Sequence, residues 1–279
     1  MRSVKIFVVA GAASLLSSMA FAADMAIAPP PMSYGPPPAA DFGGWYLRGD
    51  IGFSNQRVDN IRNTNAALYT GLTSFQEKTG FDTGGIYQIG AGYQFNHWFR
   101  VDVTGEYRGS TNFHGLDLIG FPGGFGADTY NASKSEWLFL ANAYADLGTW
   151  WCITPYVGAG IGTARVAISN FTDTGINNSG AGATPSLVTA ANGSQWNFAW
   201  ALHAGLAYKV TPGVTLELAY HYLNLGDATT GVNSNFAGTA TAQYPWTMHD
   251  ITSHDLKLGV RWNLDNAPVY APPPLIRKG

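Results

Sequence analysis

Eight stretches of the chain alternate apolar and polar residues with a period of two. The alternation is clearest over residues 98–108, where aromatic and aliphatic residues share one face and charged residues the other. Successive side chains of a β-strand point to opposite faces, so this period predicts strands. The predicted strands cover residues 45–53, 86–95, 98–108, 136–147, 155–166, 195–209, 214–223 and 255–264, and glycines make the phase of the fifth the least clear.

The connections between these strands alternate in length. Residues 96–97, 148–154 and 210–213 make short turns, whereas 54–85, 109–135, 167–194 and 224–254 are long and rich in Gly, Asn, Thr and Ser. Short periplasmic turns alternating with long extracellular loops are typical of a membrane β-barrel, and loops longer than ~15 residues are uncommon in compact soluble domains. We therefore predict an all-β fold, an eight-stranded antiparallel transmembrane β-barrel over residues 42–264.

The composition also favours a membrane barrel over a soluble fold. Charged residues make up 12% of the chain and aromatic residues 14%, and this charged share is about half of the usual one. No stretch beyond the N-terminal segment approaches the ~20 consecutive apolar residues of a transmembrane helix. Apolar surface on alternate strand positions explains both observations, because each strand then faces lipid on one side only.

The charged face of the strands must line the lumen, since a charge facing lipid would cost ~2–4 kcal/mol near the midplane. An eight-stranded barrel is only wide enough for its side chains to fill it. We therefore expect a network of ion pairs that plugs the lumen, with a substrate channel as the alternative. The six cations and seven anions predicted inside are Arg48, Asp50, Arg100, Asp102, Glu106, Arg108, Glu136, Asp146, Lys209, Glu217, Asp255, Lys257 and Arg261.

Two further motifs in the strands are similar to known kinds of site. If Lys209 pairs with Thr215, His203 falls opposite His221, but zinc would need further ligands, so we interpret both as hydrogen-bonded lumen residues. The tripeptide Arg48-Gly49-Asp50 spells a cell-adhesion motif, which inside a barrel is a coincidence. We predict no catalytic constellation, no metal site and no cofactor.

The N-terminus has the layout of a secretory signal peptide. Arg2 and Lys5 precede an apolar stretch, and Ala20-Phe21-Ala22 predicts cleavage between Ala22 and Ala23. A membrane anchor is the alternative, but the apolar stretch is short and rich in small residues. We predict a signal peptide at 1–22, a Pro-rich periplasmic linker at 23–41 and a Pro-rich periplasmic tail at 265–279.

Charge and cysteine content exclude two classes of protein. Cleavage would leave 13 Lys and Arg against 18 Asp and Glu. No basic run is present, so nucleic acid is not an expected partner. The single cysteine, Cys152, does not follow the cleavage site, which excludes a lipoprotein, and it has no cysteine with which to form an internal disulfide.

The last predicted strand carries an assembly motif. Lys257, Gly259, Trp262 and Leu264 occupy the polar, glycine, aromatic and apolar positions of the signal that the outer-membrane barrel insertion machinery recognises. Such barrels usually end at an aromatic residue, whereas this chain continues for fifteen residues, so its signal is internal.

With GGWYLRGDIG at the start of the barrel and TPYVGAGIG in the fifth strand, this motif makes the chain resemble the small porin-like outer-membrane β-barrel proteins of alphaproteobacteria. The resemblance covers nearly all of the mature chain and implies an abundant envelope protein that supports outer-membrane integrity, some members being surface antigens. In several members the alanine of an N-terminal Ala-Asp is joined to peptidoglycan, which maps here onto Ala23. The linker of 19 residues would reach up to ~60 Å at about 3.1 Å per residue.

Three functions are consistent with this sequence. The leading hypothesis is a monomeric, non-enzymatic barrel in outer-membrane lipid that supports envelope integrity and is tethered to peptidoglycan through Ala23. The first alternative is a narrow porin-like channel for small solutes, which would show stable conductance. The second is a surface adhesin or ligand-binding protein that acts through the long loops, which loop deletion would reveal.

Overall fold

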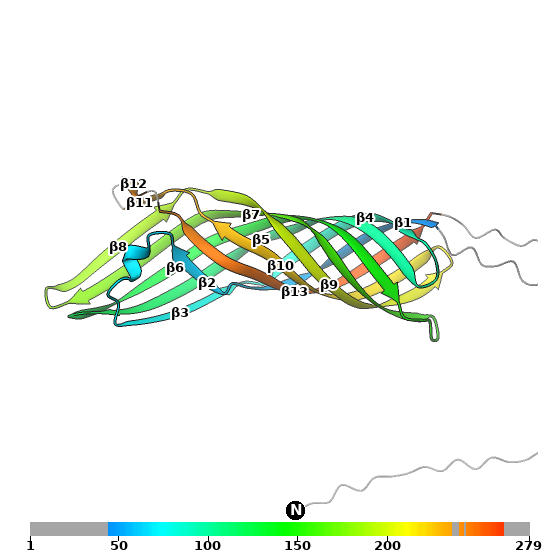
Figure 1. The fold of residues 1–279 in the computed structure, drawn as a ribbon, viewed down its shortest axis with the longest axis horizontal. Coiled ribbons are helices and arrows are strands. Elements are labelled where there is room, and N and C mark those ends of the chain that lie inside the picture. The colour runs from blue at the N-terminus through cyan, green and yellow to red at the C-terminus, as the bar shows by residue number, and fades with distance from the viewer. Residues whose placement is uncertain (1–43, 236–239, 243, 265–279) are drawn as a thin grey trace, which may run out of the picture. The chain divides into compact units, whose positions relative to one another are not determined.

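The computed structural model describes residues 44–235, 240–242 and 244–264, and within them eight strands close into a ring (Figure 1). Each ring strand pairs antiparallel with the next, and β1 pairs with β13 to close the ring. The predicted eight-stranded antiparallel β-barrel is thereby confirmed. The ring strands are β1 (Gly44–Arg57), β4 (Gly84–Gln94), β5 (Phe99–Phe121), β6 (Gly124–Asp146), β7 (Ile153–Ser179), β9 (Gly193–Thr211), β10 (Val214–Thr229) and β13 (Trp246–Asn263).

Shorter elements gather at the end of the barrel where the long connections lie (Figure 1). β2 pairs with β13, β3 with β5, and β8 with β7, while β11 pairs with both β8 and β12. These elements are β2 (Asn60–Asn63), the 3-10 helix η1 (Ala66–Tyr69), β3 (Ser74–Phe81), β8 (Gly182–Ala190), β11 (Asn233–Asn235) and β12 (Ala240–Ala242). We call this the outer end of the barrel. Within the described part of the chain, no helix is both long and apolar enough to span a membrane.

The strands are longer than the alternation predicted. β5 and β6 have 23 residues each and β7 has 27, so most of the stretches 109–135 and 167–194 form hairpins of paired strands and not irregular loops. Their Gly and Asn residues are poor strand formers, but cross-strand hydrogen bonds and neighbours outweigh that local preference.

Two bulges reverse the inside–outside alternation on the way to the outer end. The pairing of β5 with β6 gains an extra residue between Arg108 and Thr111, and the pairing of β6 with β7 gains one near Asn170, which has a φ of 54°. An extra residue turns every following side chain to the opposite face. Beyond the bulges, odd-numbered residues such as Phe113 and Phe171 are the buried ones.

Two belts of aromatic side chains mark the membrane band on the outside of the barrel. Near the short turns, Trp45 contacts Tyr93 at 5.3 Å between ring centroids, and Phe95 stacks on Phe99 at 5.6 Å; further along, Tyr107 contacts Trp137 at 4.9 Å. Phe99 and Tyr107 lie roughly 27 Å apart along one tilted strand at ~3.4 Å per residue. This separation suits the ~25 Å apolar band of outer-membrane barrels, which aromatic girdles flank.

Candidate functional site

The lumen within the membrane band holds a dense network of charged side chains. The structure places the twelve sequence-predicted residues Arg48, Asp50, Arg100, Asp102, Glu106, Arg108, Glu136, Asp146, Glu217, Asp255, Lys257 and Arg261 inside the barrel, each at most 8% exposed. They form two connected clusters, one near the short turns and one nearer the outer end.

Arg48 is the centre of the first cluster. Its guanidinium lies 2.8 Å from Asp50, 3.1 Å from Asp102 and 3.2 Å from Glu217. Glu217 is also approached by Arg261 at 3.1 Å and Arg100 at 3.6 Å, so three guanidiniums converge on one carboxylate. Buried charges are tolerated only when paired in this way.

Tyrosines close the space around the first cluster. Arg100 lies over the rings of Tyr144 and Tyr156, at 4.2 and 4.6 Å from their centroids, an arrangement that favours a cation. Tyr144 and Tyr156 stand opposite Gly158 and Gly205 on the neighbouring strands, where an added Cβ would collide with each ring. Large residues therefore lie beside glycines on adjacent strands in the narrow lumen, as filling a small barrel requires.

Arg108 is the centre of the second cluster. It donates two hydrogen bonds of 2.8 Å to Asp255, one of 2.8 Å to Glu106, and lies 3.0 Å from Glu136. The two-pronged pairing with Asp255 is the strongest geometry available to an arginine and a carboxylate. Lys257 pairs with Glu106 and donates to Gln88 at 2.9 Å, and Gln88 in turn donates to Asp50, which links the two clusters.

One residue of the network was missed and one was predicted wrongly. Lys134, 1% exposed, pairs with Glu136 and Gln56, but it lies in a stretch expected to be a loop. Lys209, expected in the lumen, is exposed because it sits near the end of β9 beside the short turn, where its long side chain can reach water. The network keeps six cations and seven anions, with Lys134 in place of Lys209.

An apolar layer lies inside the barrel beyond the charged clusters. Leu223, Leu225, Ile251 and Ile61 are 0% exposed, and they belong to one buried cluster with side chains of β6, β7 and β9. These side chains are fully buried, and the paired charges below them are at most 8% exposed. The lumen is therefore filled at two successive levels.

The remaining motifs of the strands take structural positions. His203 pairs with His221 as expected from the register, with 4.2 Å between ring centroids, and its Nε2 lies 3.0 Å from Asn142 Oδ1. In the described ranges, no group of three or more His, Cys, Asp or Glu side chains is arranged to hold a metal ion. Arg48 and Asp50 of the adhesion-like tripeptide are 3% and 4% exposed, so no partner outside the barrel can reach them.

Residues of the predicted assembly motif also contribute to the packing of the barrel. Gly259 lies opposite Asp50 in the pairing of β1 with β13, and an added Cβ would meet the Asp50 carboxylate. Lys257 points inward, whereas Trp262 and Leu264 are 45% and 55% exposed. Recognition by the insertion machinery stays a prediction, as do the signal cleavage at Ala22 and Ala23, the linker and the tail, which lie outside the described residues.

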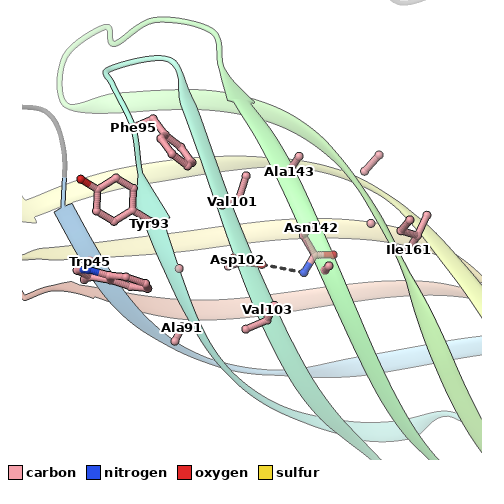
Figure 2. A pocket seen from close by; sticks show the side chains of 14 residues that line it. Trp45, Ala91, Tyr93, Phe95, Val101, Asp102, Val103, Asn142, Ala143 and Ile161 are labelled. Atoms are coloured by element: carbon pink, nitrogen blue, oxygen red, sulfur yellow. Dashed lines mark hydrogen bonds between the residues drawn. The ribbon is translucent and has the colours of Figure 1, made fainter.

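The outer surface of the barrel has a shallow apolar hollow of about 910 Å³ above the first aromatic belt (Figure 2). Trp45, Tyr93 and Phe95 stand on one side of it and Ile161 on the other, with Val101, Val103 and Ala143 between them. Small residues such as Ala143 leave the depression on a face that lipid covers.

Removing one partner of the network should destabilise the barrel strongly. Arg108→Met removes the cation that Asp255, Glu106 and Glu136 share. Glu106 and Glu136 keep Lys257 and Lys134, but Asp255 becomes an uncompensated buried charge, which costs about 3–5 kcal/mol. Urea unfolding of the refolded protein in lipid vesicles, followed by tryptophan fluorescence, measures the loss. The matched variant Arg165→Met changes an exposed arginine and should cost less than about 1 kcal/mol; equal losses in both would contradict the network's importance.

The filled lumen also predicts the electrical behaviour of the protein. Refolded mature protein in a planar lipid bilayer should give no stable, reproducible openings, while an open trimeric porin in the same bilayer conducts. Discrete openings that recur with pure protein would show that the buried layers rearrange to form a channel.

Comparison with known proteins gives the family. Residues 8–263 match the outer membrane protein beta-barrel domain. An uncharacterized protein of Brucella suis is 34% identical over 75% of this chain and 76% of its own length. The outer membrane protein PagN of Salmonella typhimurium is 28% identical (78% and 89%), and a putative adhesin of Rickettsia bellii is 32% identical (79% and 88%).

Solved structures with similarity include OprG of Pseudomonas aeruginosa, with a TM-score of 0.47 and 12% identity over 80% of this chain and 97% of that one. Another is the outer membrane protease OmpT of Escherichia coli, with a TM-score of 0.44 and 12% identity over 78% and 97%. On the family match and the relatives, this chain belongs to the outer-membrane protein β-barrel domain family, as a small barrel of the alphaproteobacterial type located in the bacterial outer membrane.

Proposed function

We propose that this barrel is a surface-binding protein whose working part is the outer end, and that its membrane part is a sealed, non-enzymatic anchor. A membrane strand needs ~9–11 residues, yet β5, β6 and β7 have 23, 23 and 27. The additional residues form paired hairpins beyond the second aromatic belt. These additional residues are not needed to span the membrane.

An exposed apolar row on these hairpins carries the proposal. Leu118, Ala127 and Ile176 are consecutive cross-strand partners on β5, β6 and β7, and Leu118 and Ile176 are 45% and 50% exposed. Leu118 lies eleven residues beyond Tyr107 on the same strand, roughly 37 Å further along it, so lipid does not cover this row. Contiguous apolar surface exposed to water marks interaction sites.

A relative of known sequence also supports a surface-binding function. The similar Rickettsia bellii protein is named a putative adhesin. The sealed lumen weighs against the porin-like alternative, and the buried tripeptide Arg48-Gly49-Asp50 plays no part in adhesion. A rigid sheet presenting an apolar row is suited to contact with a protein partner.

Changing the apolar row should weaken attachment. The double variant Leu118→Asn and Ile176→Asn, displayed on a non-adherent Gram-negative host, should reduce attachment to cultured epithelial cells about tenfold or more, since central apolar contacts contribute about 1–2 kcal/mol each. The matched control is Thr129→Asn with Thr174→Asn, an exposed pair on the adjacent cross-strand row. Equal attachment by all three proteins would refute the proposal.

A second role, support of the envelope through a tether to the cell wall, is favoured by the Ala-Asp sequence at Ala23 and the Pro-rich linker that follows it. Ala23 lies outside the described residues. In this role the barrel is a monomer held in outer-membrane lipid, with its linker reaching toward peptidoglycan.

Muramidase digestion of purified sacculi tests this tether. Mass spectrometry should find a peptide that begins at Ala23 and carries a muropeptide on its amino group. Deleting Ala23 and Asp24 should remove the adduct and release the protein from sacculi in detergent. A free amino group on Ala23 in all recovered protein would exclude the tether and leave the surface-binding proposal untouched.

A further inference from the structure

A pocket of about 450 Å³ opens at the outer end, on the inner face of the hairpins. Its lining combines three aspartates, Asp117, Asp128 and Asp173, with the aromatic side chains Tyr69, Tyr130 and Trp246. Asp117 lies ten residues beyond Tyr107 of the second aromatic belt, roughly 34 Å along β5. The pocket is therefore above the membrane band, and we call it the outer pocket.

The three aspartates are placed against one another. Asp117 is the direct cross-strand partner of Asp128, and Asp173 is opposite Tyr130, one inward position further along β6. Like charges directly opposite on neighbouring strands are destabilising. Within the described part of the chain, no lysine or arginine forms an ion pair with any of the three, in contrast to the lumen, where the carboxylates face cations.

Buried acceptor atoms in the outer pocket lack a donor. Asp117 is 2% exposed; its Oδ2 accepts a hydrogen bond of 2.9 Å from Tyr130, but its Oδ1 has no partner. Asp173 and Asn233, 9% and 5% exposed, also each have an unpartnered Oδ1. Native proteins rarely leave such groups unsatisfied, so these oxygens, among three carboxylates, favour a ligand that donates hydrogen bonds. The indole Nε1 of Trp246 in the same lining also lacks a partner.

Two glycines make room for the polar side chains. Gly175 stands opposite Asp128, and an added Cβ there would collide with the Asp128 carboxylate; Gly126 stands in the same relation to Asn177. Any larger residue at either position would push a polar group out of its place. The backbone of β6 and β7 is thus shaped around these oxygens.

We propose that the outer pocket binds a small organic cation, an amine whose ammonium group lies among the three carboxylates. The aromatic walls favour this class, because Tyr and Trp faces attract organic cations, and the volume falls within the ~300–1,000 Å³ of small-molecule sites. The residues lack the ligand arrangement of a metal site. The site goes beyond the proposed surface-binding function and is independent of it, since the apolar row lies on the opposite face of the same hairpins.

Proton uptake competes with the cation. Burial, with the nearby charges of Glu77 and Asp128, raises the pKa of Asp117 to about 6, although Tyr130 and Arg62 act in the opposite direction. Burial, Asp128 and Asp117 raise the pKa of Asp173 to about 7. Both groups are protonated at pH 5 and ionised at pH 8, so binding of a cation should tighten as the pH rises between these values.

Titration of refolded, full-length mature protein with spermidine tests the site. Isothermal calorimetry in detergent at 150 mM salt should show binding at pH 8 and at least tenfold weaker binding at pH 5. The double variant Asp117→Asn and Asp173→Asn should weaken binding at pH 8 at least tenfold. Asp82→Asn, which removes an exposed carboxylate at the same end, should bind like the natural protein.

A second measurement separates loss of the site from loss of the fold. Since the folded pKa values of Asp117 and Asp173 are raised, ionising them disfavours the folded state, and stability without ligand falls as the pH rises from about 4 to 7. Asp117→Asn with Asp173→Asn should therefore melt at a higher temperature than the natural protein at pH 8 while binding spermidine less. Heat-modifiable gel migration reports that each variant is folded.

Three results would overturn the proposal. They are unchanged spermidine binding in the folded double variant, an equal loss in Asp82→Asn, or binding of Mg²⁺ but not spermidine with the same dependence on Asp117 and Asp173. None of these depends on attachment to cells. A failure of the outer pocket and a failure of the surface-binding proposal are therefore distinguishable.

Discussion

The width of an eight-stranded barrel is the constraint on which the rest of this structure depends. The lumen has room for side chains and for little else, so each inward charge must find its counter-charge within the ring. Arg48 and Arg108 meet this demand by bridging several carboxylates each, and tyrosines opposite glycines take up the remaining space. Closure of the lumen follows from the same condition, because the groups that neutralise one another also exclude water.

Where the strands leave the membrane, inward charges no longer need a counter-charge within the ring. The network below balances six cations against seven anions, whereas Asp117, Asp128 and Asp173 lie close together and form no ion pair with a cation of residues 44–235, 240–242 or 244–264. The contrast within one continuous sheet suggests different purposes for its two halves. The membrane half anchors the barrel in lipid. The outer half carries carboxylates that lack a paired cation and apolar side chains that are exposed.

In the proposed function, a barrel with a filled lumen and extended hairpins acts through its outer end. The apolar row of Leu118, Ala127 and Ile176 and the outer pocket occupy opposite faces of the same strands. The pairing of β5, β6 and β7 fixes the apolar row and the three aspartates, while η1 and β13 add Tyr69 and Trp246 to the pocket. Rigid presentation lowers the entropic cost of binding, which accounts for the use of paired strands over most of a region whose composition is typical of loops.

The sequence by itself determined the architecture and the inward position of twelve charged residues, because a period of two separates lipid-facing from inward-facing positions without further information. It wrongly placed Lys209 in the lumen. It did not reveal Lys134 or the outer pocket. Judged by local propensity alone, the Gly-rich and Asn-rich stretches are predicted to be loops. Pairing with neighbouring strands makes them hairpins instead. The bulges between Arg108 and Thr111 and at Asn170 then inverted the alternation and turned Asp117 and Asp173 inward. Register between strands is a tertiary property, since it depends on which residues of distant segments pair, and only the folded barrel decided it.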